Sequence, residues 1–434
     1  MRSRSLLYIA FKYSFAGGYS LTTLTSARST LPFNSVQLFG IVLLGGLCAG
    51  ELARRMLALP RTTGYVLFGL LLGQSALKWI TPAHIESAQL FIDLALGLIM
   101  FELGYMVPRT SASACWNRLK VGSAISLFSA TAIAVTMAAW GFPLKTTIFA
   151  AALCLATSPA ITIATTSDVG GKGDNTGLLF TLVAINGSLA FIGVTWATSS
   201  LALSQGLFSV DVLIGVLQKI ARSIVLGGVC ALFVLRCARW LGRRSDHQHL
   251  LIIGTIVFGV GVAMSLDLSV FFPMLIFGYL TKALDRKNAV VAIRIASDAR
   301  IFLVITFVLA GAALDIGQLA RYWPVAVSIV SARFIAQFVT LRVYRNALGI
   351  TARNACFTAV GLQPMSSVAL VLLTGTQSLY GTLDTALAGS LAATILLLQL
   401  VGPLATQTAI LGFGEATHLN RPRLQPDQSR SEAT

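Results

Sequence analysis

Charged residues are scarce in this sequence of 434 residues, and acidic residues are the scarcest of them. Asp, Glu, Lys and Arg together make up 11% of the chain, where about 25% is usual in soluble proteins. Hydrophobic residues make up 56%. This composition excludes an ordinary soluble globular domain and is typical of an integral membrane protein, which has the lipid bilayer around it.

The sequence also lacks motifs that would point to an enzyme or to a nucleic-acid-binding protein. It has no nucleophile elbow and no metal-ligand spacing, and its six cysteines include no C-x-x-C pair. A net charge of +16 could attract nucleic acid, but the basic residues are scattered between apolar runs and form no basic face. We therefore expect a protein that is not an enzyme, with no cofactor, no bound metal and no nucleic-acid partner.

Apolar runs of about 20 residues, long enough to cross a bilayer, recur from residue 36 onward. They predict an all-α polytopic membrane protein with about 13 transmembrane helices. We expect an N-terminal extension at residues 1–35, a transmembrane domain at residues 36–410 and a cytoplasmic polar tail at residues 411–434. The expected spans are 36–53, 64–79, 88–107, 121–141, 146–166, 177–203, 212–235, 249–266, 269–281, 301–318, 322–341, 354–374 and 382–408.

The distribution of basic residues predicts the orientation of the chain. Of the 32 Lys and Arg residues, 22 lie in connections on the side of the C-terminus, 7 lie on the other side and 3 lie within spans. Positively charged connections stay in the cytoplasm. We therefore expect a multi-pass protein of the cell (inner) membrane, with its N-terminus outside and its C-terminus in the cytoplasm.

Two of the expected spans are interrupted by proline and polar residues. The breaks are residues 157–159 (TSP) in span five and residues 363–367 (QPMSS) in span twelve. Lipid tolerates such breaks only where protein or a water-filled cavity satisfies the freed backbone groups, so a pair of them indicates a binding site. Seven spans separate the breaks, which predicts two inverted repeats, about 36–203 and 249–408, joined by a linker helix at about 212–235.

Six segments of the sequence, taken together, form a pattern that is typical of one protein family. They are ELARRMLALPRTTGYVLFGLLLG (51–73), LALGLIMFELGYMV (94–107), ATSPA (156–160), LAGAALDI (309–316), SARF (331–334) and VGLQPMSSVALVL (360–372). Each is weak alone, but in their order and spacing they resemble the cation:proton antiporter family, the sodium/proton and potassium/proton exchangers. The resemblance covers nearly all of residues 38–404.

The resemblance implies two inverted six-helix repeats with crossed broken helices, exchange of a monovalent cation for a proton by alternating access, and a homodimer. One position departs from the family pattern. Family members place an acidic residue at the centre of the span after the first break, and here Gly187 follows Asn186. The carboxylate that alternately binds a cation and a proton is therefore missing at this position.

Residues at the breaks and near the middle of neighbouring spans are candidates for binding the substrate or ion. Their neutral oxygen atoms could coordinate a dehydrated cation, or they could form hydrogen bonds between helices. Arg333 lies at a position that is also basic in the family. It either takes part in transport or ties the broken helices together through their freed carbonyls. The candidates are Thr157, Ser158, Asn186, Gly187, Arg333, Gln363 and Ser366.

Asp93 and Glu102 are the candidates for a substitute proton carrier. They share span three, but nine residues of helix place them about 180° apart, so they cannot both face one cavity. A buried carboxyl group is easier to protonate near neutral pH, which suits a carrier. A structural role near the membrane interface is the competing interpretation.

These features together predict a secondary-active antiporter of a monovalent cation, Na⁺ or K⁺, and a proton. Two other functions remain open. The chain could be a proton-independent transporter, or an anion or neutral-solute transporter, of the same fold. It could also be a membrane scaffold or sensor that has lost antiport.

Overall fold

The structure is a computed structural model that describes residues 35–202, 210–242, 245–285, 295–366 and 384–417, together with residues 368–370, 372–373 and 376. The chain divides into two units, Met1–Leu38 and Phe39–Thr434. Of the first unit only residues 35–38 are described, as the start of helix α2. The expected N-terminal extension thus lies outside the described residues except for residue 35, and the expected tail is described only as far as residue 417.

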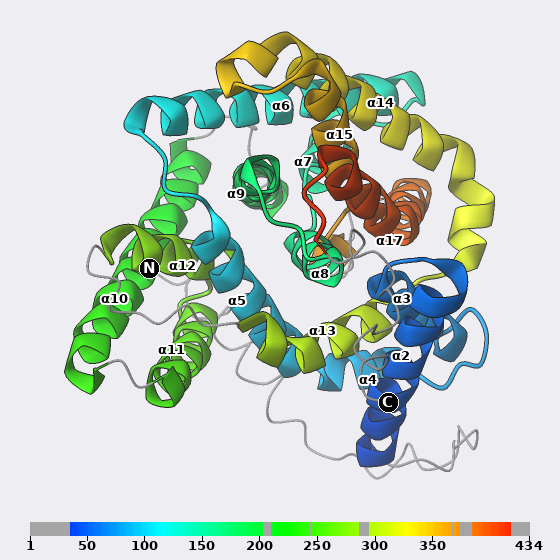
Figure 1. Ribbon diagram of the computed structural model, residues 1–434. Coiled ribbons are helices and arrows are strands. Elements are labelled where there is room, and N and C mark those ends of the chain that lie inside the picture. The colour runs from blue at the N-terminus through cyan, green and yellow to red at the C-terminus, as the bar shows by residue number, and fades with distance from the viewer. Residues whose placement is uncertain are drawn as a thin grey trace, which may run out of the picture. The chain divides into compact units, whose positions relative to one another are not determined.

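The described residues form helices and turns, with two isolated β-bridges. The all-α prediction is confirmed (Figure 1). The helices of the first half are α2 (Ser35–Leu57), α3 (Arg61–Leu72), α4 (Pro82–Ser87), α5 (Gln89–Met106), α6 (Ala112–Ala139), α7 (Leu144–Cys154), α8 (Pro159–Val169) and α9 (Asp174–Ala202). Those of the second half are α10 (Val210–Leu241), α11 (Ser245–Ser265), α12 (Phe271–Leu284), α13 (Ile295–Ala312), α14 (Ile316–Leu348), α15 (Ala352–Gly361) and α17 (Thr385–Phe413).

Eight helices in the described part of the chain are long and apolar enough to cross a membrane. They are α2, α5, α6, α9, α10, α11, α14 and α17, and α7, α12 and part of α13 are shorter apolar helices. Every expected span overlaps a described helix, so the prediction of a multi-pass membrane protein is confirmed. The number of thirteen spans stays a prediction.

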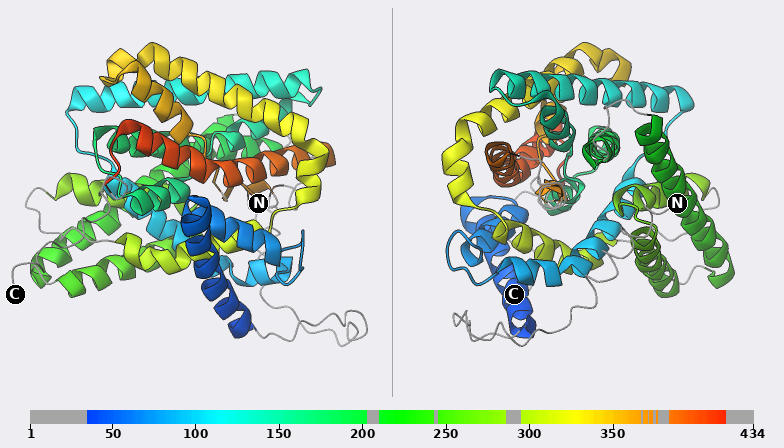
Figure 2. Two further views of the ribbon diagram at one scale, coloured as in Figure 1. Left: turned by 45° about the vertical axis from the view of Figure 1, so that its right-hand side comes forward. Right: turned by 180° about the vertical axis from the view of Figure 1, so that it is seen from behind.

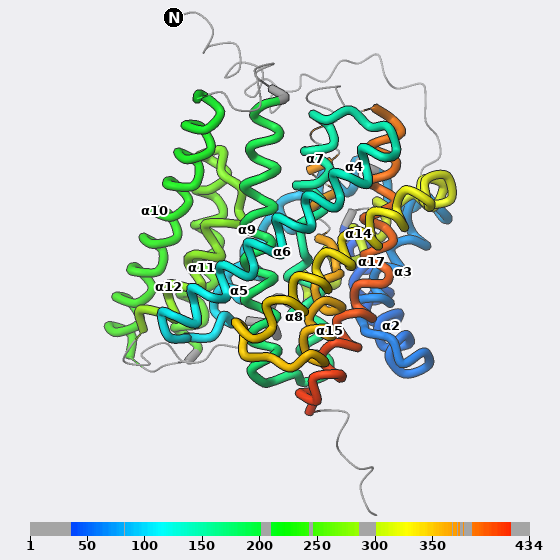
Figure 3. The backbone as a smooth tube through the Cα atoms, turned by 90° about the horizontal axis from the view of Figure 1, so that it is seen from above, coloured from blue at the N-terminus to red at the C-terminus, as the bar shows by residue number. Residues whose placement is uncertain are grey.

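The helices pack in two groups. In the first, which we call the crossing group, α14 packs against α6 and α17, α17 packs against α15 and α8, and α9 packs against α6 and α7. Figure 2 shows α17, in red, running alongside α14 and α15. In the second, which we call the supporting group, α12 packs against α5 and α10, and α13 packs against α3 and α5 (Figure 3). α8 also touches α3, α5 and α13, so it lies where the two groups meet.

Within the supporting group, α3 and α13 approach so closely that glycine is required on both helices. A Cβ atom at Gly69 would overlap the carbonyl oxygen of Val308, and a Cβ atom at Gly311 would overlap the carbonyl oxygen of Val66. Small residues let transmembrane helices pack backbone against backbone, where van der Waals contact replaces the hydrophobic effect as the driving force. Each helix therefore presents a glycine to the backbone of the other, and a side chain at either position requires the two backbones to move apart.

This contact predicts that Gly69→Ala lowers the melting temperature of the purified protein, because one methyl group forces the two backbones apart. Overpacking of this kind destabilises by roughly 1–3 kcal/mol. The matched control is Gly254→Ala in α11, where a Cβ atom meets nothing within 4 Å. Thermal unfolding in detergent should distinguish the two variants, and equal melting temperatures would show that α3 and α13 are not in tight contact.

Candidate functional site

The two breaks lie against each other. The backbone N–H of Ser158 donates to the carbonyl of Pro364 at 2.8 Å, and the N–H of Ser366 donates to the carbonyl of Ala156 at 3.1 Å. These bonds form an isolated antiparallel bridge between Thr157 and Met365. The predicted crossing of two broken helices is therefore confirmed, and each break satisfies part of the backbone that the other leaves free.

Local sequence explains where the first break begins and ends. α7 stops at Cys154, and α8 starts at Pro159, which is suited to the first position of a helix because it has no N–H to leave unpaired. The Ser158 side chain accepts a hydrogen bond from the N–H of Ile161 at 3.3 Å and caps α8. Thr157 and Ser158 are 1% and 2% exposed.

Arg333 of α14 joins the two breaks. Its guanidinium donates from Nη1 to the carbonyl of Gln363 at 2.9 Å, and from Nη2 to the carbonyl of Leu362 and to Oγ1 of Thr157, both at 3.1 Å. The residue is fully buried, and no ion pair to it is found among the described residues. The geometry matches the second interpretation of Arg333, because its charge meets the carbonyls that α15 leaves free at its C-terminal end.

Gln363 extends this polar centre into α14. Its Nε2 donates to Oε1 of Gln337 at 2.7 Å and to the carbonyl of Ala359 at 2.9 Å, while its Oε1 is buried without a hydrogen-bond partner. Gln337 was not identified from the sequence. It lies four residues after Arg333 and so on the same side of the helix, and that spacing was the available signal.

Ser366 has a local role at the second break. Its Oγ accepts a hydrogen bond from the N–H of Val368 at 3.3 Å, as a side chain does at a turn or at the start of a helix. Ser367, the last residue of the second break, lies outside the described residues.

Asn186 and Gly187 have partners on other helices. The Oδ1 of Asn186 accepts a hydrogen bond from Oγ of Ser126 in α6 at 3.0 Å. A Cβ atom at Gly187 would lie 2.5 Å from Cζ of Phe271 in α12, and the Phe271 ring stacks on Phe191 with centroids 6.5 Å apart. An aromatic ring therefore occupies the space into which a side chain at residue 187 would extend.

The two candidate proton carriers differ in burial. Glu102 is 7% exposed, whereas Asp93 is half-buried and accepts a hydrogen bond from Nε2 of Gln89 at 3.2 Å. Both lie on α5, which packs mainly on the supporting group but also touches α8 and α9.

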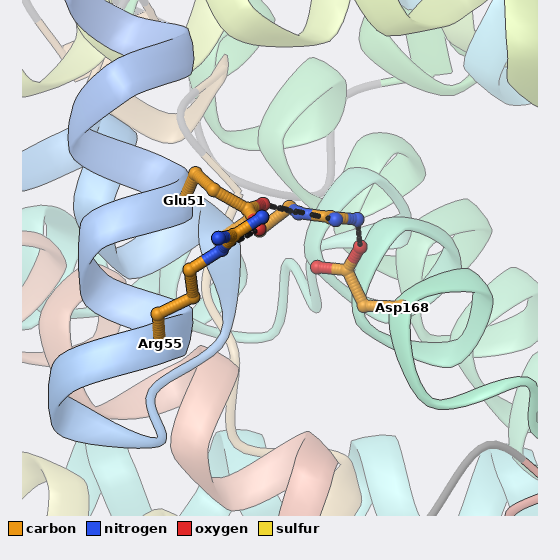
Figure 4. A network of polar contacts seen from close by, with 4 residues as sticks. Glu51, Arg55 and Asp168 are labelled. Carbon is orange, nitrogen blue, oxygen red and sulfur yellow. Dashed lines mark hydrogen bonds and ion pairs between the residues drawn. The ribbon is translucent and has the colours of Figure 1, made fainter.

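An ion-pair network connects the far end of α8 to α3 (Figure 4). Arg61 at the start of α3 contacts Asp168 of α8 at 2.9 Å and Glu51 of α2 at 3.1 Å, and Glu51 also pairs with Arg55 at 2.6 Å. A cavity of about 80 Å³ beside this network is lined by residues of α3, α8 and α13. The network thus joins the crossing group to the supporting group.

The segment after α17 is hydrogen-bonded to the start of α9, next to the loop that joins α8 to α9. The carboxylate of Glu415 accepts hydrogen bonds from the backbone N–H groups of Asn175 and Thr176, at 3.0 and 2.8 Å, and from their side chains, at 2.8 and 2.6 Å. Residues far apart in the sequence thereby cap α9. Partial burial raises the pKa of the Glu415 carboxyl, but the hydrogen bonds from Thr176 and Asn175 outweigh burial, and the net pKa lies below its ordinary value.

Among the solved structures that share this fold are two of the sodium proton antiporter MjNhaP1 from Methanocaldococcus jannaschii. One, at pH 8, has 18% sequence identity and a TM-score of 0.70 and covers 88% of this chain and 98% of that one. The other, an EM structure, has 17% identity and a TM-score of 0.71 and covers 90% and 99%. The chain therefore shares the fold of these two structures.

Residues 39–411 match the family model described as "Sodium/hydrogen exchanger, transmembrane". The chain belongs to the sodium/hydrogen exchanger family. No curated protein matches the sequence. The resemblance seen in the sequence is confirmed at the level of the family, and the family is one of transporters.

The Glu415 cap predicts a stability difference that depends on pH. A carboxyl group with a depressed pKa in the folded state stabilises the protein above its unfolded pKa, about 4.3 for Glu, and this stability is lost as the pH falls through the folded pKa. Glu415→Gln should therefore destabilise by about 1 kcal/mol at pH 7. The difference from wild type should narrow below about pH 4.

Melting temperatures of both proteins at pH 7.5 and at about pH 3, below the unfolded pKa, would check this expectation. Glu86→Gln, which alters an exposed carboxylate in α4, is the matched control and should leave the melting temperature unchanged. A Glu415→Gln deficit that is equally large at both values would mean that the carboxylate charge is not what stabilises the cap.

Proposed function

We propose that this protein is a secondary-active antiporter that exchanges a monovalent cation, Na⁺ or K⁺, for a proton by alternating access. Membership of the sodium/hydrogen exchanger family and a fold shared with a sodium proton antiporter support cation/proton antiport. The observation that carries the proposal is the pair of broken helices that exchange backbone hydrogen bonds between Ser158 and Pro364 and between Ser366 and Ala156. Crossed half-helices of this kind are where transporters bind ions near the middle of the membrane.

The cation is proposed to bind beside the crossing, where Thr157, Ser158 and Gln363 supply neutral oxygen atoms. Gln363 is the strongest of these ligands, because its buried Oε1 has no hydrogen-bond partner. Arg333 is assigned a positioning role, since both Nη atoms are already engaged by the broken helices. Asn186 and Gly187 are proposed to line the approach to the site from α9.

The proton carrier is proposed to be Glu102, with Asp93 as the second candidate. A carrier must be able to lose its charge inside the membrane, and Glu102 is the more deeply buried of the two. In this proposal Gly187 replaces the usual carboxylate of the family, and the charge that alternates between proton and cation has moved to α5.

The wider assignments follow the sequence. We infer two inverted repeats at about 36–203 and 249–408 within a domain of residues 36–410, and a cytoplasmic tail from residue 411. A homodimer in the inner membrane with the C-terminus in the cytoplasm completes the proposal. The excess of basic residues on the C-terminal side supports this orientation.

A second candidate function has one observation in its favour. The Nε atom of Arg333 is buried without a hydrogen-bond partner, and no acidic residue pairs with this arginine among the described residues. A buried donor of this kind would suit an anion or a polar neutral solute. We rank this function lower, because both Nη atoms of the guanidinium already donate to carbonyl and hydroxyl groups.

The first test is dissipation of an imposed pH gradient in proteoliposomes on addition of Na⁺, K⁺ or Li⁺. The wild-type protein should respond to at least one cation. Glu102→Gln, which keeps the shape but cannot ionise, should reduce the response by at least tenfold, whereas Asp93→Asn should retain most of it. An inert wild type would overturn cation/proton antiport and leave proton-independent transport, anion or neutral-solute transport, and a non-transporting role.

A designed variant separates an inactive fold from an altered site. Gly187→Asp alone would drive its side chain into Phe271, so the informative variant combines Gly187→Asp with Phe271→Ala, and Phe271→Ala alone is its control. If the wild type is inert and only the double variant responds to a cation, the fold is competent and the natural protein has another substrate or role.

Alternating access also gives the Arg61–Asp168 ion pair a role. If the crossing group moves against the supporting group, this contact holds α8 in the arrangement described here. A partly exposed ion pair contributes up to about 1 kcal/mol, so Asp168→Asn should raise hydrogen exchange in residues 159–169 by up to about fivefold. Arg55→Ala, which removes only the exposed pair within α2, is the control. Unchanged exchange in Asp168→Asn would show that the ion pair does not hold α8.

A further inference from the structure

One residue of α17 lies level with both breaks, although nothing in the sequence singled it out. α17 packs against α8 and runs in the same direction. Ser158, just before α8, bonds to Pro364, which lies against Gly402, and Gly171, just after α8, lies against Ile410. α8 extends about 15 Å from Val169 back to Pro159, and the same distance back from Ile410 reaches Leu400, beside Gln399.

The packing of α15 against α17 gives the same level. α15 runs opposite to α17, so that a Cβ atom at Gly361 would lie 3.0 Å from Cβ of Ala409 and a Cβ atom at Gly402 would lie 2.8 Å from Cα of Pro364. Continuing along α17 in that direction, one turn beyond Gly402, leads to Gln399. Both packing registers therefore place Gln399 at the depth of the crossing.

Gln399 is buried with no hydrogen bond to its side chain. It is 2% exposed, and neither its Nε2 nor its Oε1 has a partner. An unpaired buried polar group costs about 1–3 kcal/mol, and natural proteins rarely leave both ends of an amide unsatisfied unless a ligand or water meets them. At the crossing, the Oε1 of Gln363 is likewise buried without a hydrogen-bond partner.

We propose that Gln399 is a substrate-binding residue of the crossing site and contacts a partly hydrated monovalent cation. This inference rests on the proposed function and adds a ligand from α17 to those of the two breaks. The amide oxygen coordinates the cation, as neutral oxygen ligands do for hard cations. The amide nitrogen donates to a water molecule that the cation retains, so a bare cation would satisfy only half of this side chain and a partly hydrated one satisfies all of it.

The expected effects separate substrate binding from a structural role. Gln399→Leu removes two unpaired polar atoms and keeps a similar volume, so the melting temperature without cation should stay equal or rise. The cation concentration for half-maximal antiport should increase about tenfold. A structural role would show the opposite pattern, with a lower melting temperature and an unchanged half-maximal concentration.

Two further variants complete the test. Gln407→Leu is the matched control, because it makes the same change two turns along α17 at a half-buried position, and it should leave the half-maximal concentration unchanged. Gln399→Glu keeps an oxygen ligand and adds a charge that a proton can cancel. Its half-maximal concentration should therefore fall as the pH rises, which gives a readout even if Gln399→Leu does not fold.

The experiment is cation-dependent antiport in proteoliposomes for the wild type and these three variants, with Na⁺, K⁺ and Li⁺ as probes. An active wild type with unchanged half-maximal concentrations in Gln399→Leu overturns this inference alone. If Gln399→Leu does not fold, a Gln399→Glu protein with the pH dependence of wild type overturns it as well. A wild type inert to all three cations overturns the proposed function, and the inference with it.

Discussion

The arrangement of this protein depends on how backbone carbonyls freed inside the membrane are satisfied. α15 ends at Gly361, and the carbonyls of Leu362 and Gln363 have no continuing helix to bond to. The guanidinium of Arg333 meets both of them and reaches Thr157 at the other break. The guanidinium of Arg333 therefore supplies hydrogen bonds that lipid cannot supply to these carbonyls. The crossing, the position of α14 and the polar centre around Gln363 all follow from this contact.

The same contact explains why a charge is tolerated at this depth. The C-terminal end of a helix carries partial negative charge, so Arg333 is balanced by dipoles and does not require a carboxylate beside it. The absence of an acidic residue at Gly187 is thus compatible with a folded crossing. In the proposed site it alters the chemistry, since neutral oxygens such as those of Thr157, Ser158 and Gln363 carry no charge that a proton could cancel.

Much of the fold could be predicted from the sequence, because its signals are local. Apolar runs gave the helices, and proline beside polar residues at 157–159 and 363–367 gave the two breaks that the structure brings together. The contacts within the candidate site were harder to predict from the sequence. Gln337 could have been found from its spacing to Arg333, but Ser126, Phe271 and Glu415 meet their partners only through packing between distant segments. The burial of Gln399 without a hydrogen-bond partner is likewise a result of that packing. A single sequence carries no signal for such contacts.

The Glu415 cap has a consequence for how the chain is assembled. Protein synthesis proceeds from the N-terminus, so α9 is made some 240 residues before the carboxylate that caps it. The N–H groups of Asn175 and Thr176 can therefore meet this acceptor only after α17 has been made. A chain truncated before residue 415 would lack the carboxylate that caps α9.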